Sequence, residues 1–311
     1  MMKKIKSSNI LKLICNNIKK RISLKILNYN KYCQNRLGIS INDYIEYSKQ
    51  IIIQIIINAN KLKKGKNFFI NIKENKSLYD IYFDGKYEKD TRNYIEQGEK
   101  IPKIKIILEN GIKSIDNLFY ECQCIKEIKF IKFNRTDFTD MSYLFYSCEN
   151  LENLDITELK TNNVTNMRSI FFNCISLKEL DLSNINTENV DNMSYMFCGC
   201  ISLENLNLTN FKTDKVKYMN DMFSGCSSLK KLDLSHFITK NVENMNCMFN
   251  GCSSLIDLNI ANFNTKKISH TYLMFGNCSE ELKEKVKEQN IKIIENDENE
   301  LLNESVHSED Y

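Results

Sequence analysis

The chain has 311 residues, of which 42% are hydrophobic, so it can bury a core in one large or two modest domains. Its apolar runs, such as residues 51–57, are far shorter than the roughly 18 apolar residues that a membrane-spanning helix needs. We therefore expect no membrane span. The net charge of +3 hides a gradient: residues 1–100 hold 21 basic and 9 acidic residues, residues 101–278 hold 18 and 20, and residues 279–311 hold 4 and 11. We interpret this charge gradient as solvated faces and a mobile tail. The alternative is that the charged regions contact an acidic partner or a membrane surface.

The first 21 residues imitate a secretory signal peptide, with a basic start, some apolar residues and Cys15. Lys12 and Asn16 interrupt the apolar stretch, and Ile14 is larger than the small residue that precedes a lipoprotein cysteine. We therefore expect no export segment, and this expectation favours a cytoplasmic location.

Residues 1–62 are predicted to form a helical N-terminal region. Apolar residues recur there at helical spacing, and Asn42 and Asp43 can cap a helix. The isoleucines of 51–57 are β-branched, so a strand is the alternative at that position. Residues 8–40 are loosely similar to short helical modules such as the F-box, which recruit a ligase scaffold, and a plain helical cap fits them equally.

Residues 63–100 are polar, rich in tyrosine and punctuated by glycine, which predicts a linker or a small irregular segment. Lys63, Lys64 and Phe68 belong to a mixture of basic and aromatic residues of the kind that can contact nucleic acid. No signature of a nucleic-acid-binding fold accompanies them, so nucleic acid is disfavoured as a partner.

The stretch NMSYMFCGCISLENLNL at residues 192–208 recurs with a period of 26 residues, and the rest of the chain is organised around it. Seven cysteines recur at this spacing without exception. An apolar residue and a phenylalanine lie four and three positions before each of them. The cysteines are Cys122, Cys148, Cys174, Cys200, Cys226, Cys252 and Cys278. A period of this length predicts a solenoid over residues 101–278 in which each unit buries its apolar face against its neighbours. The column cysteines should be buried, reduced thiols.

Within a unit, Val190, Met193, Met196 and Cys200 follow one another at steps of three and four, which predicts a short helix that ends at Gly199. In another part of each unit, leucines alternate with polar residues in Leu-x-Leu triplets such as residues 180–182. This alternation predicts a short strand. Each unit is thus expected to hold one strand and one helix.

Units of the form LDLSNINTENVDNMSYMFCGCISL resemble the 26-residue repeats of BspA-like leucine-rich repeat surface proteins. With the periodicity, this resemblance predicts an α/β repeat: a leucine-rich-repeat-like solenoid of short parallel strands and short helices, with an α-helical N-terminal region. It implies binding and adhesion without catalysis, and a place at the cell surface. After the repeats, residues 279–311 are predicted to form a capping helix at 280–289, with Leu282 and Val286 inward, and an acidic, disordered tail.

Catalytic, cofactor and metal motifs are absent from the sequence, so we expect no enzyme, no cofactor and no small-molecule substrate. The best polar constellation is a file of residues at the outward strand positions, expected on a concave strand face. We predict that this file binds a protein partner that presents basic or amide groups. Its members are Asp155, Asp181, Asn207, Asp233 and Asn259.

Two classes of function follow. The first is a non-enzymatic protein-interaction or adhesion module that uses the repeats. The second is an F-box-like ubiquitin-ligase substrate adaptor whose N-terminal helices recruit the ligase. Recovery of a ligase scaffold by the first 65 residues would separate the second from the first.

Overall fold

The computed structural model describes residues 48–73, 75–84, 90–101, 103–264 and 266–289. The chain divides into one unit of residues 1–50 and a second of residues 51–311, and the fold described below belongs to the second. The F-box-like segment and the acidic tail, together with most of the predicted N-terminal helices, lie outside the described residues.

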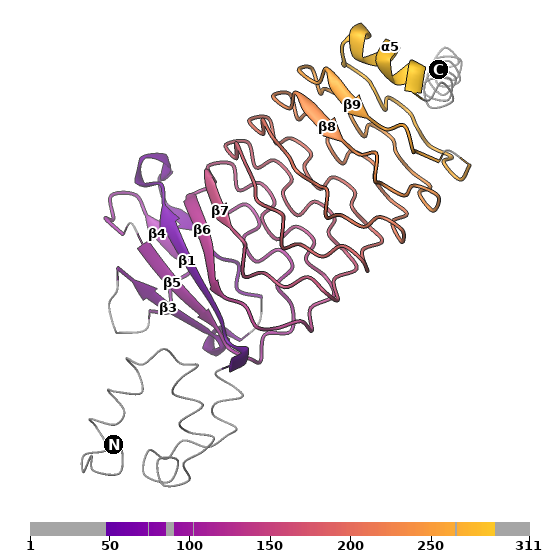
Figure 1. Cartoon of the computed structure of the whole chain (residues 1–311). Helices are drawn as coiled ribbons and strands as arrows, with labels where there is room; N and C mark the ends of the chain where they lie inside the picture. The colour runs from indigo at the N-terminus through magenta and orange to yellow at the C-terminus, as the bar shows by residue number, and fades with distance from the viewer. Residues whose placement is uncertain (1–47, 74, 85–89, 102, 265, 290–311) are drawn as a thin grey trace, which may run out of the picture. The chain divides into compact units, whose positions relative to one another are not determined.

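A mixed five-stranded sheet begins the second unit, with the strand order β3-β5-β1-β6-β7 (Figure 1). Its strands are β1 (Ile51–Ile57), β3 (Tyr79–Phe83), β5 (Lys103–Leu108), β6 (Ile125–Lys132) and β7 (Asn153–Asp155). Strand β1 pairs antiparallel with β5 and β6, and β3 pairs antiparallel with β5. Strand β6 pairs in parallel with β7, so it joins the antiparallel part of the sheet to the repeats.

Two smaller sheets each have two strands. One is antiparallel and contains β2 (Lys66–Phe68) and β4 (Tyr94–Glu96), and the other is parallel and contains β8 (Lys231–Asp233) and β9 (Asp257–Asn259). Short 3₁₀ helices η2 (Ala59–Lys61) and η3 (Lys76–Leu78) precede β2 and β3. The segment expected as a linker, residues 63–100, therefore contains β2, β3 and β4.

The prediction of an α/β repeat solenoid with an α-helical N-terminal region is wrong. Residues 51–57 form the central strand β1, because alternate isoleucines are buried and the backbone pairs on both sides. Between residues 103 and 278, the described residues contain no α-helix, and the five-stranded sheet that joins the repeats is mixed. Helix α5 (Glu280–Gln289) follows the repeats.

Left-handed residues explain why the predicted repeat helices do not form. Tyr195 has φ 59° and Gly199 has φ 74°, and the corresponding positions of the neighbouring units are also left-handed. Alternate amides of this segment donate to the next unit, as from Met193 N to Tyr218 O at 3.0 Å and from Phe197 N to Met222 O at 2.9 Å. A helix would need those amides for bonds four residues back in the chain.

The 26-residue units are nevertheless hydrogen-bonded in register. A series of parallel single-residue bridges links each unit to the next at positions 26 residues apart. The series runs through Asp140, Asn166, Asn192, Tyr218, Asn244 and His270. The register that the cysteine spacing predicts is therefore the register of backbone pairing.

The core between the units consists of stacked identical columns. Phe119, Phe145, Phe171, Phe197, Phe223, Phe249 and Phe275 are fully buried, and consecutive rings stack with centroids 5.4–5.8 Å apart. The column cysteines are buried free thiols, as predicted. From Cys148 onward each thiol donates to a phenylalanine carbonyl of the preceding unit at 3.0–3.3 Å.

Helix α5 confirms the prediction of a helix at residues 280–289. Leu282 and Val286 are fully buried, and the helix packs against β9. The Gln289 side chain accepts a hydrogen bond from Ile260 N at 2.9 Å and donates one to Leu258 O at 2.8 Å. The helix thus covers the edge that the last repeat strand would otherwise leave open.

Candidate binding groove

The structure places the five predicted binding residues at equivalent points of consecutive units. Asp155 ends β7, Asp233 ends β8 and Asn259 ends β9, whereas Asp181 and Asn207 lie in units without a regular strand. The strand positions predicted from the Leu-x-Leu triplets are thus confirmed in three of these five units.

Each of these five side chains caps the turn that follows it. The side-chain oxygen accepts a hydrogen bond from the backbone N–H two residues further along the chain, at 2.9–3.3 Å. The donors are Thr157, Ser183, Thr209, Ser235 and Ala261. Asp and Asn favour such turns because their short side chains reach their own backbone. The recurrence of Asp and Asn along the file therefore has a structural cause, the capped turn, which exists whether or not a partner binds.

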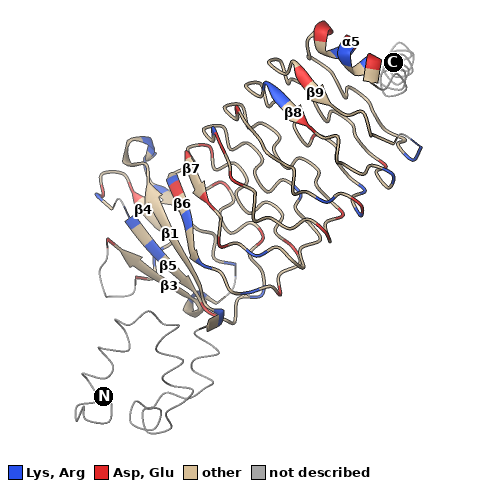
Figure 2. Ribbon diagram, viewed as in Figure 1, with Lys and Arg blue, Asp and Glu red and all other residues tan. Residues whose placement is uncertain are grey.

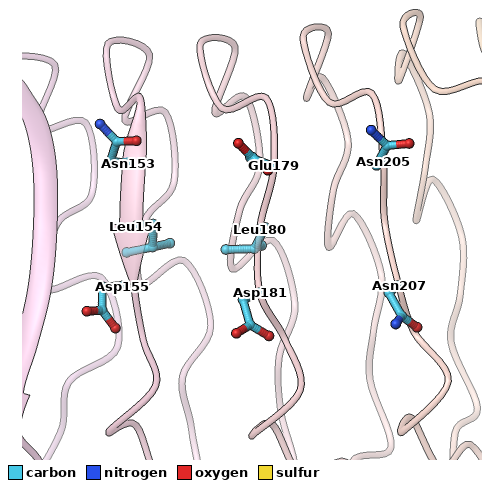
Figure 3. Close-up of a pocket in the computed structure, with 8 residues that line it drawn as sticks. All are labelled: Asn153, Leu154, Asp155, Glu179, Leu180, Asp181, Asn205 and Asn207. Carbon is cyan, nitrogen blue, oxygen red and sulfur yellow. The ribbon is translucent and has the colours of Figure 1, made fainter.

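Asp155, Asp181 and Asn207 line one groove of about 470 Å³ together with residues the prediction did not include. Its floor is formed by Leu154 and Leu180 (Figure 3). On the other side of the floor lies a second polar row that consists of Asn153, Glu179 and Asn205. We call this site the leucine groove. Asp233 and Asn259 are not among the residues that line it.

The carboxylates in the leucine groove differ in the hydrogen bonds and ion pairs that they make. Asp155 Oδ2 pairs with Lys129 Nζ at 2.5 Å, and this hydrogen bond lowers the pKa of the Asp155 carboxyl. The pKa of Asp181 is lowered by hydrogen bonds from the Ser183 side chain and backbone. The Glu179 side chain has no hydrogen bond or ion pair within the described residues, although its backbone is bridged to Asn205. Asp181 is exposed, and one of its two carboxylate oxygens is used by the turn.

Charge does not continue along the file as a single negative strip. Figure 2 shows basic and acidic residues together on β6 and β8, and an acidic residue on β9. Lys231, at the start of β8, pairs with Asp257 of β9 at 3.2 Å. The pKa of Asp233 is lowered, chiefly by the hydrogen bond from Ser235 N. Asp233, like Asp181, makes no ion pair among the described residues, and the leucine groove brings two such carboxylates, Glu179 and Asp181, into one site.

Sequence reasoning missed the partial exposure of Leu154 in the floor of the groove. Leu154 and Leu206 belong to the leucine columns that the periodicity assigned to the core, yet both are only partly buried. No sequence signal separates them from Leu232 and Leu258, which are buried, because the residue type is the same.

The described residues form neither a group of metal ligands nor a membrane-spanning helix. No group of three His, Cys, Asp or Glu side chains there comes together in a way that could hold a metal ion. None of the helices there is both long and apolar enough to cross a membrane.

Comparison with known proteins gives one match. The family model described as "Mycoplasma protein of unknown function, DUF285" matches residues 113–206 and 173–290. No curated protein and no solved structure matches the chain. The two family matches overlap and together span residues 113–290, which is more than half of the chain. The chain therefore belongs to the DUF285 family.

Proposed function

We propose that this protein is a non-enzymatic interaction module that binds an extended segment of a protein partner in the leucine groove. The observation that carries the proposal is the pair of polar rows on either side of an apolar floor. A partner chain that lies along the floor can bury apolar side chains against Leu154 and Leu180. Its polar groups then meet carboxylates and amides on both sides.

The repeat spacing suits an extended chain. Equivalent residues of paired parallel strands lie about 4.8 Å apart, and an extended chain advances about 3.3 Å per residue. A partner that runs across the units therefore meets a new pair of polar side chains every one to two residues. Basic side chains and amides of the partner are the groups that match Glu179, Asp181 and Asn205.

Affinity in such a groove comes from several weak contacts. An exposed ion pair contributes about 0.2–1 kcal/mol, and salt screens it. Burial of the leucine floor contributes roughly 25 cal/mol per Å² of apolar surface, which added salt does not screen. Binding should therefore weaken with salt without being abolished.

The wider setting of this function rests on the sequence. The resemblance to BspA-like surface proteins supports adhesion at the cell surface, and a partner in the cytoplasm is the alternative. Fractionation and surface labelling of native cells decide between these two locations, because only a surface protein is modified by a reagent that does not enter cells.

The test of the leucine groove uses a photo-cross-linking residue in place of Asn205 in the full chain, with Lys160 as the control position. The captured protein is then purified and titrated against the variants Glu179→Lys and Asp181→Asn. Asn at 181 retains the oxygen that caps the turn, so its effect reports charge alone. We expect the two changes together to weaken binding by about 1–2 kcal/mol.

The matched control is Glu158→Lys, since Glu158 is exposed and lies outside the groove. Binding that is equal in the groove variants and in this control would falsify the proposal. A partner that cross-links equally well from position 160 would also count against it.

A further inference from the structure

A second surface of the repeats carries a cluster of half-buried aromatic rings. Its rings come from the units around Cys122 to Cys200, in the segment between the methionine and cysteine columns. They belong to Tyr120, Tyr143, Tyr146, Phe172 and Tyr195, and we call this cluster the aromatic face. This segment of the unit is distinct from the strand segment that forms the leucine groove.

Duplication of the unit does not explain the aromatic face. The buried phenylalanine column keeps its identity through all seven units. The columns of the aromatic face do not, because the positions that follow Tyr120, Tyr146 and Phe172 at 26-residue intervals are Cys198, Ser224 and Asn250. In the other column, Ser169 stands between Tyr143 and Tyr195, and Asp221, Cys247 and Leu273 follow them. In these two columns, aromatic residues therefore occur only in the units up to that of Cys200.

The stacking of the rings determines which partners can use them. Tyr120 and Tyr146 stack with centroids 4.6 Å apart and planes at 5°, and Tyr146 and Phe172 stack at 4.5 Å and 4°. Tyr146 is therefore covered on both faces, and its exposed surface is its edge. Nucleobases bind aromatic side chains by stacking on their faces, and both faces of Tyr146, the central ring of the stack, are occupied. Ring edges that carry hydroxyl groups suit a protein partner instead.

Arg168 extends the aromatic face with a fixed positive charge. Its Nε donates to Tyr143 Oη at 3.0 Å, and its guanidinium carbon lies 4.7 Å from the centre of the Tyr195 ring. Burial, followed by the negative charge of Asp221, raises the pKa of Tyr195, and Asp221 makes no ion pair with Arg168 among the described residues. The two terminal nitrogens of Arg168 have no acceptor within the described part of the chain.

The other two arginines of the described residues behave differently. Arg92 pairs with Asp90 and Glu99, and Arg135 pairs with Asp137 through two nitrogens. Arg168 is held in place by Tyr143 and Tyr195, and the donors of its two terminal nitrogens are unused among the described residues. Such a fork matches a carboxylate with two parallel hydrogen bonds.

We propose that the aromatic face and Arg168 form a second binding surface for a protein segment that presents a carboxylate between apolar side chains. Arg168 binds the carboxylate, and the ring edges pack against the flanking apolar groups. The carboxylate is either an Asp or Glu side chain or a free chain terminus. This inference is independent of the leucine groove, because the two sites share no residue.

The test is selection of displayed random peptides on the full chain, in one library with internal peptides and in a second with free C-termini. We expect enriched peptides to carry a carboxylate flanked by apolar residues, and the library that yields them identifies its source. Synthetic versions of those peptides are then titrated against Arg168→Gln, Arg168→Lys and Tyr146→Ser. Serine is the residue that the chain itself has at the equivalent position 224.

Arg168→Gln and Tyr146→Ser should each weaken peptide binding by roughly tenfold or more, as expected of central Arg and Tyr contacts. Arg168→Lys should lose most of that affinity, because an ammonium lacks the planar fork. Lys230→Gln, which removes one exposed charge elsewhere, should have no effect. Urea unfolding of each variant checks folding, and Arg168→Gln, which leaves the ring stack intact, keeps the test valid if Tyr146→Ser does not fold.

Several outcomes overturn this proposal. Enriched peptides without a carboxylate, or peptides whose binding ignores Arg168, remove its basis. Peptides that lose binding on Glu179→Lys occupy the leucine groove instead, which supports the proposed function and rejects the aromatic face as the site. The absence of any enriched peptide that depends on Arg168 has the same consequence for the aromatic face.

Discussion

The Thr187 hydroxyl donates a hydrogen bond of 2.9 Å to the backbone carbonyl of Lys212 and accepts one of 2.7 Å from the backbone N–H of the same residue. Thr187 is buried, and the reciprocal arrangement satisfies both main-chain groups of Lys212 at a corner of the unit. Thr213 and Thr239 make the same pair of bonds to the units that follow them. One hydroxyl per unit thus joins each unit to the next.

Thr187→Val should therefore destabilise the protein by about 2–4 kcal/mol. Valine has the same shape but leaves the Lys212 amide and carbonyl without their partner, and each buried unsatisfied group costs about 1–3 kcal/mol. Urea denaturation measures the loss, and hydrogen exchange at the Lys212 amide should accelerate. Thr187→Ser is the control, since it retains the hydroxyl and should lose far less stability. Equal stability of the valine and serine variants would contradict the assigned role.

The column thiols predict a loss of stability in alkali. Burial raises the pKa of Cys148, Cys174 and Cys200 far above the ordinary value of about 8.5. Above that value the unfolded chain releases thiol protons that the folded chain retains, so stability is complete below about pH 8 and falls as pH rises. Each ionising thiol contributes a loss of about 1.4 kcal/mol per pH unit.

The measurement is the urea midpoint between pH 7 and 10 in the presence of a reductant. Cys174→Ala removes one buried thiol and should reduce the slope by about 1.4 kcal/mol per pH unit in the alkaline range. Its folding at pH 7 serves as the reference. A midpoint that does not change with pH in the parent protein would show that the thiols ionise equally in both states.

Partly exposed Cys198 provides a separate test of thiol chemistry. Burial, and then the charge of Asp221, raises the pKa of Cys198 to about 12. The thiolate is the reactive form, so labelling of Cys198 should be slow at pH 7 and accelerate about tenfold per pH unit up to pH 10. Labelling by a maleimide followed by peptide mapping measures the rate. A pH-independent rate at this residue would contradict the shift.

The phenylalanine stack should be most sensitive in its middle. Phe197 lies between Phe171 and Phe223, with ring centroids at 5.5 and 5.7 Å, and is fully buried. Phe197→Ala should cost about 3–5 kcal/mol in the free energy of unfolding, measured in urea. Phe275, at the end of the stack, has only Phe249 beside it among the column rings, so Phe275→Ala should cost less. A larger loss of stability for Phe275→Ala than for Phe197→Ala would contradict this prediction.

Gln289 should protect the last strand from other chains. Its side chain occupies Ile260 N and Leu258 O, two backbone groups beside the edge of β9. Gln289→Ala leaves these groups open and should increase self-association, which sedimentation velocity detects. Gln289→Glu is an informative control, because a carboxylate still accepts from Ile260 N but cannot donate to Leu258 O. It should give an intermediate degree of association.

Periodicity in the sequence established which positions are buried. The 26-residue interval placed the cysteine and phenylalanine columns, and the burial of Cys200 and Phe197 confirms this, whereas Leu154 and Leu206 of the leucine columns are only partly buried. The C-terminal helix also followed from local pattern, since Leu282 and Val286 lie four residues apart on one face of a charged segment. Burial is readable in this way because it depends on residue type, which the sequence states directly.

The conformation that carries those buried residues was decided by the tertiary structure. Met193, Met196 and Cys200 have helical spacing, but a run of turns with left-handed residues at Tyr195 and Gly199 produces the same spacing. The choice depends on where the amides find acceptors, and here the neighbouring unit supplies them. Isoleucines 51–57 likewise became a strand because β5 and β6 pair with them from positions about 50 and 75 residues further along the chain.

The candidate binding site divides along the same line. The outward position of Asp181 followed from alternation in the Leu-x-Leu triplet, and the structure leaves that side chain exposed. The groove around it, the partial exposure of Leu154 and the pairing of Asp155 with Lys129 depend on how neighbouring units pack, which residue type does not encode. The sequence determined the register and the buried columns through residue type, whereas hydrogen bonding between units determined the backbone conformation and the groove.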